Sequence, residues 1–474
     1  MSAIEINNGF NPADVQGNIL RGYRYGRVRH VMLEVVNARL ARGWLSATVS
    51  GVEGDPPITT EEHWDVKPES CFNIAFTVHG LRALGVSKAS LRTFPDEFVE
   101  GMDAQAVKLG DTGTSAPDHW PAPFDDTTKI HMIASIHADD VEHLDRVEAL
   151  IPGSGEYQAF KILGARDGWN FDGDNVHFDY RDNISQPRFI GIHDRDRFPD
   201  KQPLAPLGSM LMGYETEYEG LLWTIPEPDA LGRNGCYNAF RVLAQDVEAF
   251  ENYLKQAANY LLTDPLADEL LPPGDEEKIG PDMSRHAALC EVVAAKMCGR
   301  WRNGVPIALS PDTPNPAEKV SLTDFDYTHG DRCPYGAHTR RANPRGGKIV
   351  QRAANHTRRV VRRGIPYGDP FDPAKPDGKE RGLLGNFLCA NLAAQFEALM
   401  CDWINLGLQD PRITGCNDPL LGANHPETSW FDIPLPSGKV IHLEGLPRLV
   451  HVRGGAYTFL PSISAIRYLA SLRG

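Results

Sequence analysis

The sequence lacks closely spaced cysteine pairs, long hydrophobic runs and an excess of basic residues. No two of its eight cysteines are spaced as CxxC, which gives little support to a zinc ribbon or a thioredoxin-like redox motif. In a chain of 474 residues, scattered cysteines are typical of reduced, buried side chains. We therefore expect these thiols to act as small core residues in a reducing compartment.

Apolar segments long enough for a membrane are also absent. No stretch holds eighteen consecutive apolar residues, which excludes an ordinary transmembrane helix. Residues 1–18 have neither the basic region nor the apolar core of a secretory signal, so we expect a cytoplasmic protein without a membrane partner, although export by another route stays open. The formal net charge of −15 argues against a nucleic-acid partner, whose phosphates require a basic face.

One local plan recurs along the chain: a short alternating apolar run, a polar starter and an amphipathic helix. Predicted strands of this kind lie at 29–37, 71–78, 129–138 and 236–244. Strand–helix units in both halves favour an α+β architecture, with helices packed on antiparallel sheets. The segment 193–208, rich in Pro, Asp and Arg, is interpreted as a linker between the halves.

The stretch CPYGAHTRRANPR (333–345) places one histidine, His338, beside several arginines. Arg340, Arg341 and Arg345 could stabilise an anionic group such as a cofactor carboxylate. A neutral imidazole in this setting is a candidate axial ligand of haem iron. A lone histidine among arginines is more often a solvated surface group, so this reading stays open on spacing alone.

Two further stretches carry candidate chemistry. HFDYRDNISQPRF (177–189) contains Asp182, which is either an acid/base carboxylate on a loop or part of a structural turn. RRVVRRGIPYG (358–368) has the alternation of a strand, which sends Arg362 and Arg363 to opposite faces. One of them could then point into a cavity while the other stays in solvent, although a solubilising charge run is the simpler interpretation.

Together, and in this order, the three stretches resemble the dye-decolorizing peroxidases, which are haem enzymes that use hydrogen peroxide. The family signature is a GxxDG loop followed by proline, a CPxxAHxR…NPR segment with the proximal histidine, and an RRG strand with a distal arginine. This chain has DYRDNISQP, CPYGAHTRRANPR and RRGIPYG in these places. The longer, mostly non-secreted branch is the best match, and further similar stretches lie at 13–23, 73–86, 299–311, 381–397 and 452–470.

The resemblance implies a fold and a chemistry. It implies two ferredoxin-like domains of the dimeric α+β barrel superfamily type, in which antiparallel β-sheets have helices packed on them. Residues 1–205 would form the N-terminal domain with the distal Asp loop, and residues 206–474 the C-terminal domain with the haem pocket. The expected cofactor is one haem b per chain. The expected partners are hydrogen peroxide, small or bulky aromatic electron donors, and a second chain in a homodimer.

The resemblance also assigns roles to residues of this chain. His338 would ligate the haem iron, Asp182 would move the proton of peroxide, and Arg362 would stabilise the developing negative charge. The residues expected to contact the haem are Arg340, Asn183, Ile184, Leu384 and Phe387.

Two assignments outside the central residues are less specific. Tyr367, in the RRGIPYG strand, is a candidate surface oxidation site for donors too large for the pocket, or an ordinary packed tyrosine. A ligating histidine normally gives its other ring N–H to a carboxylate or carbonyl, and Glu397 and Asp402 are candidates for that partner.

The chain departs from the family pattern in the GxxDG loop, where Asp179 and Asn183 replace the glycines. Asn tolerates a left-handed backbone, so we expect Asn183 to keep the turn. If Asp179 and Asp182 both face the pocket, their repulsion raises one pKa and weakens peroxide activation. A non-catalytic haem carrier, store or sensor, and an enzyme that acts on haem or porphyrin itself, therefore remain alternatives.

Overall fold

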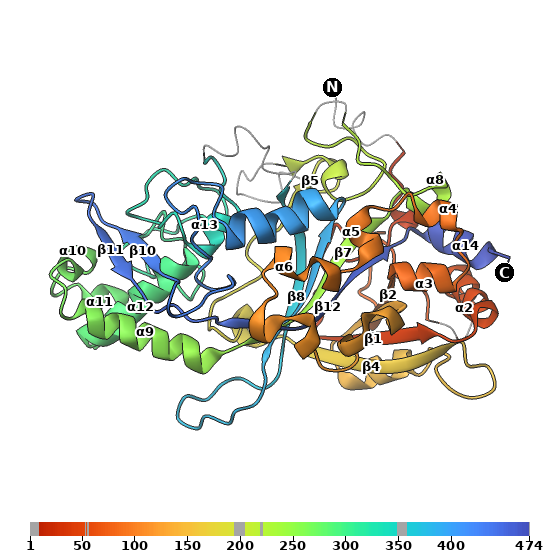
Figure 1. The fold of residues 1–474 in the computed structure, drawn as a ribbon, viewed down its shortest axis with the longest axis horizontal. Coiled ribbons are helices and arrows are strands. Elements are labelled where there is room, and N and C mark those ends of the chain that lie inside the picture. The colour runs from red at the N-terminus through yellow and green to blue at the C-terminus, as the bar shows by residue number, and fades with distance from the viewer. Residues whose placement is uncertain are drawn as a thin grey trace.

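The computed structural model describes residues 9–473 except 53, 55, 194–203, 219–220 and 348–357. Within this part of the chain, eight strands form one sheet in the order β4-β1-β3-β2-β12-β7-β9-β8 (Figure 1). In chain order they are β1 (Arg27–Val35), β2 (Ser70–Phe76), β3 (Met132–Ala138), β4 (Phe160–Trp169), β7 (Cys236–Gln245), β8 (Val361–Tyr367), β9 (Gly382–Cys389) and β12 (Val450–Leu460). Most of the predicted linker at 193–208 lies outside the described residues.

The sheet consists of two halves with the same strand order. In each half the four strands, numbered by sequence, lie in the order 4-1-3-2 and pair antiparallel, which is the ferredoxin-like arrangement. The halves join where β12 pairs with β2, at Phe459 and Phe76. At the two outer edges β4 contacts β8, and Gly168 lies so close to Ile365 that a side chain there would clash, so the sheet curls into a barrel. The predicted α+β barrel class is confirmed.

Local sequence explains where the strands stop and the helices start. Each of the four predicted strands is confirmed, and each is followed by a helix whose first turn is capped by a polar side chain. Asn37, Thr77, Asp140 and Asp246 each accept a hydrogen bond from the backbone N–H three residues ahead. The capped helices are α2 (Ala38–Ser50), α3 (Val78–Ala83), α7 (Val141–Glu148) and α9 (Val247–Leu261).

The segment between β7 and β8 builds an outer lobe, at the left of Figure 1. Helix α9 packs there on α12 (Arg285–Cys298), and the hairpin of β10 (Phe431–Pro434) and β11 (Val440–Leu443) lies nearby. At the other end of the molecule, α14 (Ile463–Ser471) packs on α2. The short helices are α4 (Lys88–Leu91), α5 (Asp96–Glu100), α6 (Ala106–Leu109), α8 (Asp229–Gly232), α10 (Ala267–Leu270), α11 (Glu276–Ile279) and α13 (His338–Ala342).

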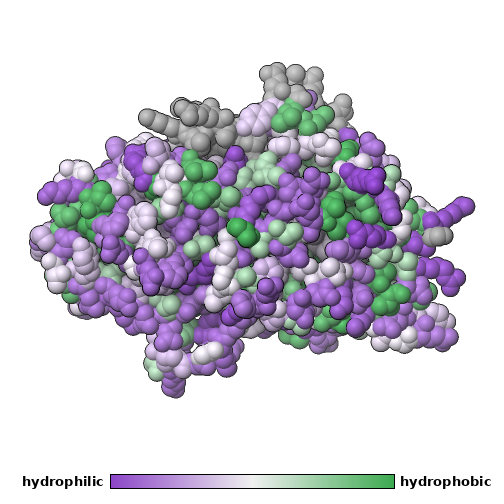
Figure 2. All heavy atoms as spheres, in the orientation of Figure 1, coloured by the Kyte–Doolittle hydropathy of each residue, from purple (hydrophilic) through white to green (hydrophobic). Residues whose placement is uncertain are grey.

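A π-helical segment follows β9 and consists of η11 (Leu392–Glu397) and η12 (Leu399–Asn405). The parallel strand pair β5 (Arg188–Phe189) and β6 (Leu204–Ala205) flanks the predicted linker. All eight cysteines are free and six are buried, which confirms their predicted role as core residues. Of the helices that the structure describes, none is both long and apolar enough to cross a membrane. The face shown in Figure 2 is mainly hydrophilic, with hydrophobic residues in separate groups.

Candidate active site

A cavity of about 290 Å³ lies against the outer face of strands β7, β8 and β9. Loop 176–187, helix α13 and the π-helical segment close it from the other sides. His338, Asp182 and Arg362, which lie far apart in the sequence, all line this one cavity. The structure therefore brings together the three residues to which the sequence assigned the central roles.

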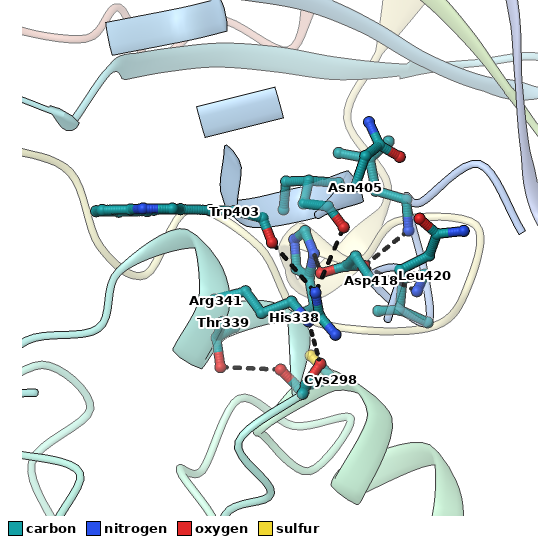
Figure 3. Close-up of polar contacts among 12 residues, drawn as sticks. Cys298, His338, Thr339, Arg341, Trp403, Asn405, Asp418 and Leu420 are labelled. Atoms are coloured by element: carbon teal, nitrogen blue, oxygen red, sulfur yellow. Dashed lines mark hydrogen bonds and ion pairs between the residues drawn. The ribbon is translucent and has the colours of Figure 1, made fainter. Parts of the chain in front are cut away.

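His338 is the first residue of α13, and a buried carboxylate orients its ring (Figure 3). Its Nδ1 lies 3.0 Å from Oδ2 of Asp418, whose side chain is 0% exposed. The other oxygen of Asp418 accepts hydrogen bonds from the backbone N–H groups of Leu420 and Leu421. Burial raises the pKa of Asp418, but His338, Arg341 and the Leu421 N–H lower it by more, so the net pKa is below its usual value. An ionised Asp418 accepts the Nδ1 proton and leaves Nε2 as the free ring nitrogen.

The two carboxylates predicted to play this orienting role are engaged elsewhere, so that prediction is wrong. Glu397 binds Nζ of Lys108 and the hydroxyl of Tyr457, each at 2.8 Å. Asp402 accepts a hydrogen bond from Arg358 at 3.1 Å. The actual partner lies 80 residues beyond the histidine in sequence, and no motif in the chain connects the two positions.

Side-chain contacts to backbone carbonyls hold α13 in place. The hydroxyl of Thr339 donates to the carbonyl of Cys298 at 2.8 Å (Figure 3). The fully buried guanidinium of Arg341 donates to the carbonyls of Gly336 and Cys416 at 2.9 and 2.8 Å. Arg341 is therefore a structural clamp for the histidine segment rather than a cation available to an anionic ligand.

A carboxylate and a guanidinium lie together in another part of the cavity wall, which is formed by loop 176–187 and β8. Nη2 of Arg362 lies 3.7 Å from Oδ1 of Asp182 and donates to the carbonyl of Ser185 at 3.2 Å. The side chain of Gln186 pairs with the backbone N–H and carbonyl of Arg362, which fastens the loop to the strand. The Asp182 and Arg362 side chains are 37% and 41% exposed, so the pair is accessible from the cavity.

The two residues that replace the family glycines keep the turn. Asp179 has φ +60° and Asn183 has φ +57°, the left-handed conformation that glycine adopts most readily and that Asp and Asn tolerate. Both side chains are exposed and neither lines the cavity. Asp179 therefore does not face the cavity beside Asp182, and the structure does not support the predicted haem contact of Asn183.

Of the other residues predicted to contact the cofactor, two line the cavity and one does not. Ile184 and Phe387 line the cavity as expected. Leu384 does not: it is fully buried in the core, whereas its neighbours Leu383 and Gly385 line the cavity. Because side chains alternate between the faces of a strand, the prediction was wrong by one position.

Arg340 is also absent from the cavity wall, because other partners occupy its guanidinium. It donates to the carbonyls of Cys333 and His329 at 2.6 and 3.0 Å and lies 4.4 Å from the ring centre of Tyr335. The prediction that it contacts a cofactor carboxylate is therefore not supported. The arginines that do line the cavity are Arg181, Arg300, Arg345, Arg359 and Arg362.

Arg359 is one of the lining arginines available to an anion. Burial, and then the charges of Arg345 and Arg362, lower the pKa of Arg359 to about 9. Among the described residues, its guanidinium makes no hydrogen bond. A negative group bound beside Arg359 would offset the repulsion among the positive charges of Arg345, Arg359 and Arg362.

The donor set fits a haem. The cavity offers one oriented imidazole with a free Nε2, a cationic wall for carboxylates, and apolar side chains from the sheet and the π-helical segment, among them Phe387, Phe396 and Met400. Within the described ranges, no group of three or more His, Cys, Asp or Glu residues could hold a bare metal ion.

Comparisons with known proteins agree with this geometry. Residues 14–154 match the family model described as "DyP dimeric alpha+beta barrel domain". The dye-decolorizing peroxidase msp1 of Mycetinis scorodonius is 28% identical over 98% of this chain and 88% of its own. The multifunctional dye peroxidase DyP2 of an Amycolatopsis species is 26% identical over 96% of this chain and 95% of its own. A solved dye-decolorizing peroxidase in complex with 2,6-dimethoxyphenol superimposes with a TM-score of 0.79 at 26% identity, covering 98% of this chain and all of the other.

The fold and the cavity, joined to these likenesses over nearly the full length, define a peroxidase of the haem-binding barrel class. Over nearly its full length the chain is similar to dye-decolorizing peroxidases, and residues 14–154 match the barrel domain of that family.

Proposed function

We propose that this chain binds one haem b and uses hydrogen peroxide to oxidise dyes, phenols and other aromatic donors by one electron at a time. The observation that carries the proposal is the placement of His338 and the Asp182–Arg362 pair around one cavity. When bound, the haem supplies the iron at which peroxide is reduced and through which electrons leave the donors.

On the histidine side, the chain holds and orients the cofactor. Nε2 of His338 would ligate the iron, and Asp418 would fix the ring and raise its basicity through Nδ1. Arg345 and Arg359 would bind the haem carboxylates, since both line the cavity and the Arg359 guanidinium makes no hydrogen bond to a described residue. These two arginines take the place that the sequence had suggested for Arg340.

On the opposite side, the chain moves a proton. The Asp182 carboxylate would accept a proton from one oxygen of hydrogen peroxide and return it to the other, so that water leaves. The guanidinium of Arg362 would stabilise the negative charge that develops on the departing oxygen. Oδ1 of Asp182 lies 3.7 Å from Nη2 of Arg362, so the carboxylate is close to the guanidinium without a direct hydrogen bond to it.

Donors of two sizes would be oxidised at two places. Small phenols would enter the cavity, and a similar dye-decolorizing peroxidase has been solved in complex with one such phenol, 2,6-dimethoxyphenol. Larger donors would give electrons at Tyr367, whose hydroxyl donates to Oε1 of Glu380 at 3.0 Å, so that a proton acceptor is already in place. Burial and the Glu380 charge raise the pKa of Tyr367, which keeps the phenol protonated until it is oxidised.

The remaining proposals rest on the sequence alone. We place the boundary between the two ferredoxin-like domains at residues 205/206. This position lies after β4, the last sheet strand of the first half, which ends at Trp169, and before β7, the first sheet strand of the second half, which begins at Cys236. We also propose a homodimer in the cytoplasm.

The test of the function is the absorption spectrum of the haem-loaded protein before and after one equivalent of hydrogen peroxide, followed by turnover of 2,6-dimethoxyphenol. We expect a rapid spectral change and sustained oxidation of the phenol. A bound haem that does not react with peroxide would identify a carrier, store or sensor instead. Conversion of the haem or of an added porphyrin without peroxide would identify an enzyme that acts on the tetrapyrrole.

A further inference from the structure

The inner face of the barrel is unusually rich in polar side chains. Strand alternation points Arg362 toward the cavity described above and its neighbour Arg363 into the barrel. From the sequence, one of the two arginines is expected to stay in solvent. Arg363 is instead partly buried, and its guanidinium donates to the carbonyls of Asn18 and Ile19. The polar residues that face the barrel interior are His30, Asn73, Ser135, His137, Asn238, Arg363, Asn386 and Thr458.

Part of this interior is a continuous hydrogen-bonded chain. Nδ2 of Asn238 donates to Oδ1 of Asn386 at 2.8 Å and to the hydroxyl of Thr458 at 3.3 Å. Nδ2 of Asn386 lies 3.4 Å from Nε2 of His30, whose Nδ1 lies 2.9 Å from the hydroxyl of Ser135. Because the amide is a donor, Nε2 of His30 acts as the acceptor and Nδ1 carries the proton. Burial lowers the pKa of His30 to about 4, which keeps this neutral form.

A second chain of contacts approaches from the N-terminal half. Nδ2 of Asn73 donates to Oε1 of Gln16 at 3.3 Å, and the Gln16 amide reaches the backbone of β2. Nε of Arg363 donates to the carbonyl of Asn18 at 2.7 Å, and the Asn18 amide lies 3.4 Å from Nε2 of His137. None of these bonds connects Asn73 directly to the first chain.

A cavity of about 30 Å³ lies between the two chains. Asn73 and Asn238 both line it, with side chains from residues that are 5% and 3% exposed. Among the described residues, Oδ1 of each asparagine has no hydrogen-bond partner. A buried amide oxygen without a donor is unfavourable, and a bound donor would remove this cost at both positions.

We propose that this cavity binds one ordered water molecule, whose two O–H groups donate to Oδ1 of Asn73 and Oδ1 of Asn238. The cavity is large enough to admit a water molecule, and its lining is polar. A cation would also satisfy two oxygens, but Arg363 lines the same cavity and opposes a second positive charge there. The water joins β2 of the first half of the barrel to β7 of the second, and so acts as an internal bridge between the halves.

The direct test is a high-resolution crystal structure of the complete haem-loaded protein, which requires no variant. We expect one density peak at hydrogen-bond distance, about 2.7–3.2 Å, from both asparagine oxygens. No peak, or a peak that contacts only one of the two oxygens, would overturn the bridge. An anomalous signal at this position in crystals soaked with rubidium would identify a cation site and would overturn the proposal as well.

Thermal unfolding of three variants tests the bridge in solution. Asn73→Leu and Asn238→Leu should each lower Tm, and the double variant should lower it by less than the two separate shifts together, because both substitutions remove the same water. Additive shifts would show that the two oxygens do not share a ligand. Thr48→Val is the matched control, since it removes a buried hydroxyl outside this cavity, and it should leave the density peak in place.

Discussion

The two sides of the haem cavity hold their charged groups in opposite ways. On the histidine side, Asp418 is fully buried, lies 3.0 Å from His338 and receives two backbone hydrogen bonds. On the peroxide side, Asp182 and Arg362 are 3.7 Å apart and each is more than a third exposed. One pair is fixed by its surroundings, and the other lines the cavity in which the haem would bind.

This difference corresponds to the two tasks of the site. A ligand of the iron must keep one orientation, and a buried carboxylate that accepts several hydrogen bonds is costly to displace. An acid/base group must gain and lose a proton, and at 3.7 Å from Arg362 the Asp182 carboxylate is not held by a hydrogen bond to it, so Asp182 can change its protonation state without loss of structure.

The largest effect is expected from removal of the axial ligand. His338→Ala should abolish stable haem binding, because no other histidine lines the described part of the cavity. The haem-to-protein ratio of the purified variant, from its absorption spectrum, is the measurement. His63→Ala, at an exposed position far from the cavity lining, is the control and should keep a full complement of haem. Normal haem content in His338→Ala would show that another residue ligates the iron.

On the opposite side, Arg362→Leu should keep the haem and slow the reaction with peroxide by about 10²-fold, the usual effect of losing one charge-stabilising donor. Stopped-flow absorption with increasing peroxide measures the rate constant. Arg467→Leu, on the exposed face of α14, should react at the normal rate. If Arg362→Leu also reacts normally, the guanidinium does not contribute to peroxide reduction.

A change to Asp418, which orients His338, should have a smaller effect on haem binding than the loss of His338 itself. Asp418→Asn retains the shape of the side chain but removes the charge that Nδ1 of His338 faces, and we expect haem affinity to fall by about 10-fold. The iron–histidine stretching frequency, measured by resonance Raman spectroscopy, should fall as well because the imidazole becomes a weaker donor. An unchanged frequency would contradict the orienting role of Asp418.

The smallest effect is expected at Tyr367, which belongs to neither side. Tyr367→Phe should lower the turnover of a bulky dye severalfold and leave both the peroxide reaction and 2,6-dimethoxyphenol oxidation unchanged. Steady-state kinetics with the two donors separates these outcomes. Equal losses with both donors would mean that Tyr367 supports the structure of the cavity and is no separate oxidation site.

Sequence patterns predicted the elements well because their signals are local. Alternating apolar runs and the caps at Asn37, Thr77, Asp140 and Asp246 depend on neighbouring residues, and the structure contains every strand and helix they indicated. The three residues with predicted central roles each lie within a short motif, and the structure places all three around one cavity. The register of β9 was harder, because only pairing with β7 and β8 decides which of two adjacent leucines faces the cavity.

The missed residues depend on contacts that no local pattern encodes. Asp418 follows an unremarkable Cys-Asn pair, and only the folded chain brings it beside His338. The clustered arginines near that histidine all donate to backbone carbonyls, and the backbone path decides that Arg345 lines the cavity while Arg340 and Arg341 do not. The polar interior of the barrel was missed for the same reason, because its members come from different strands.

The central claim is that Asp182 is the carboxylate that moves the proton of peroxide, and a pair of variants tests it most directly. Asp182→Asn and Asp179→Asn change two carboxylates of the same loop, of which only Asp182 lines the cavity. With both proteins loaded with haem, stopped-flow mixing with peroxide should show a loss of about 10²-fold or more for Asp182→Asn. It should show a normal rate for Asp179→Asn. A normal rate for Asp182→Asn, or an equal loss for both, would contradict the account.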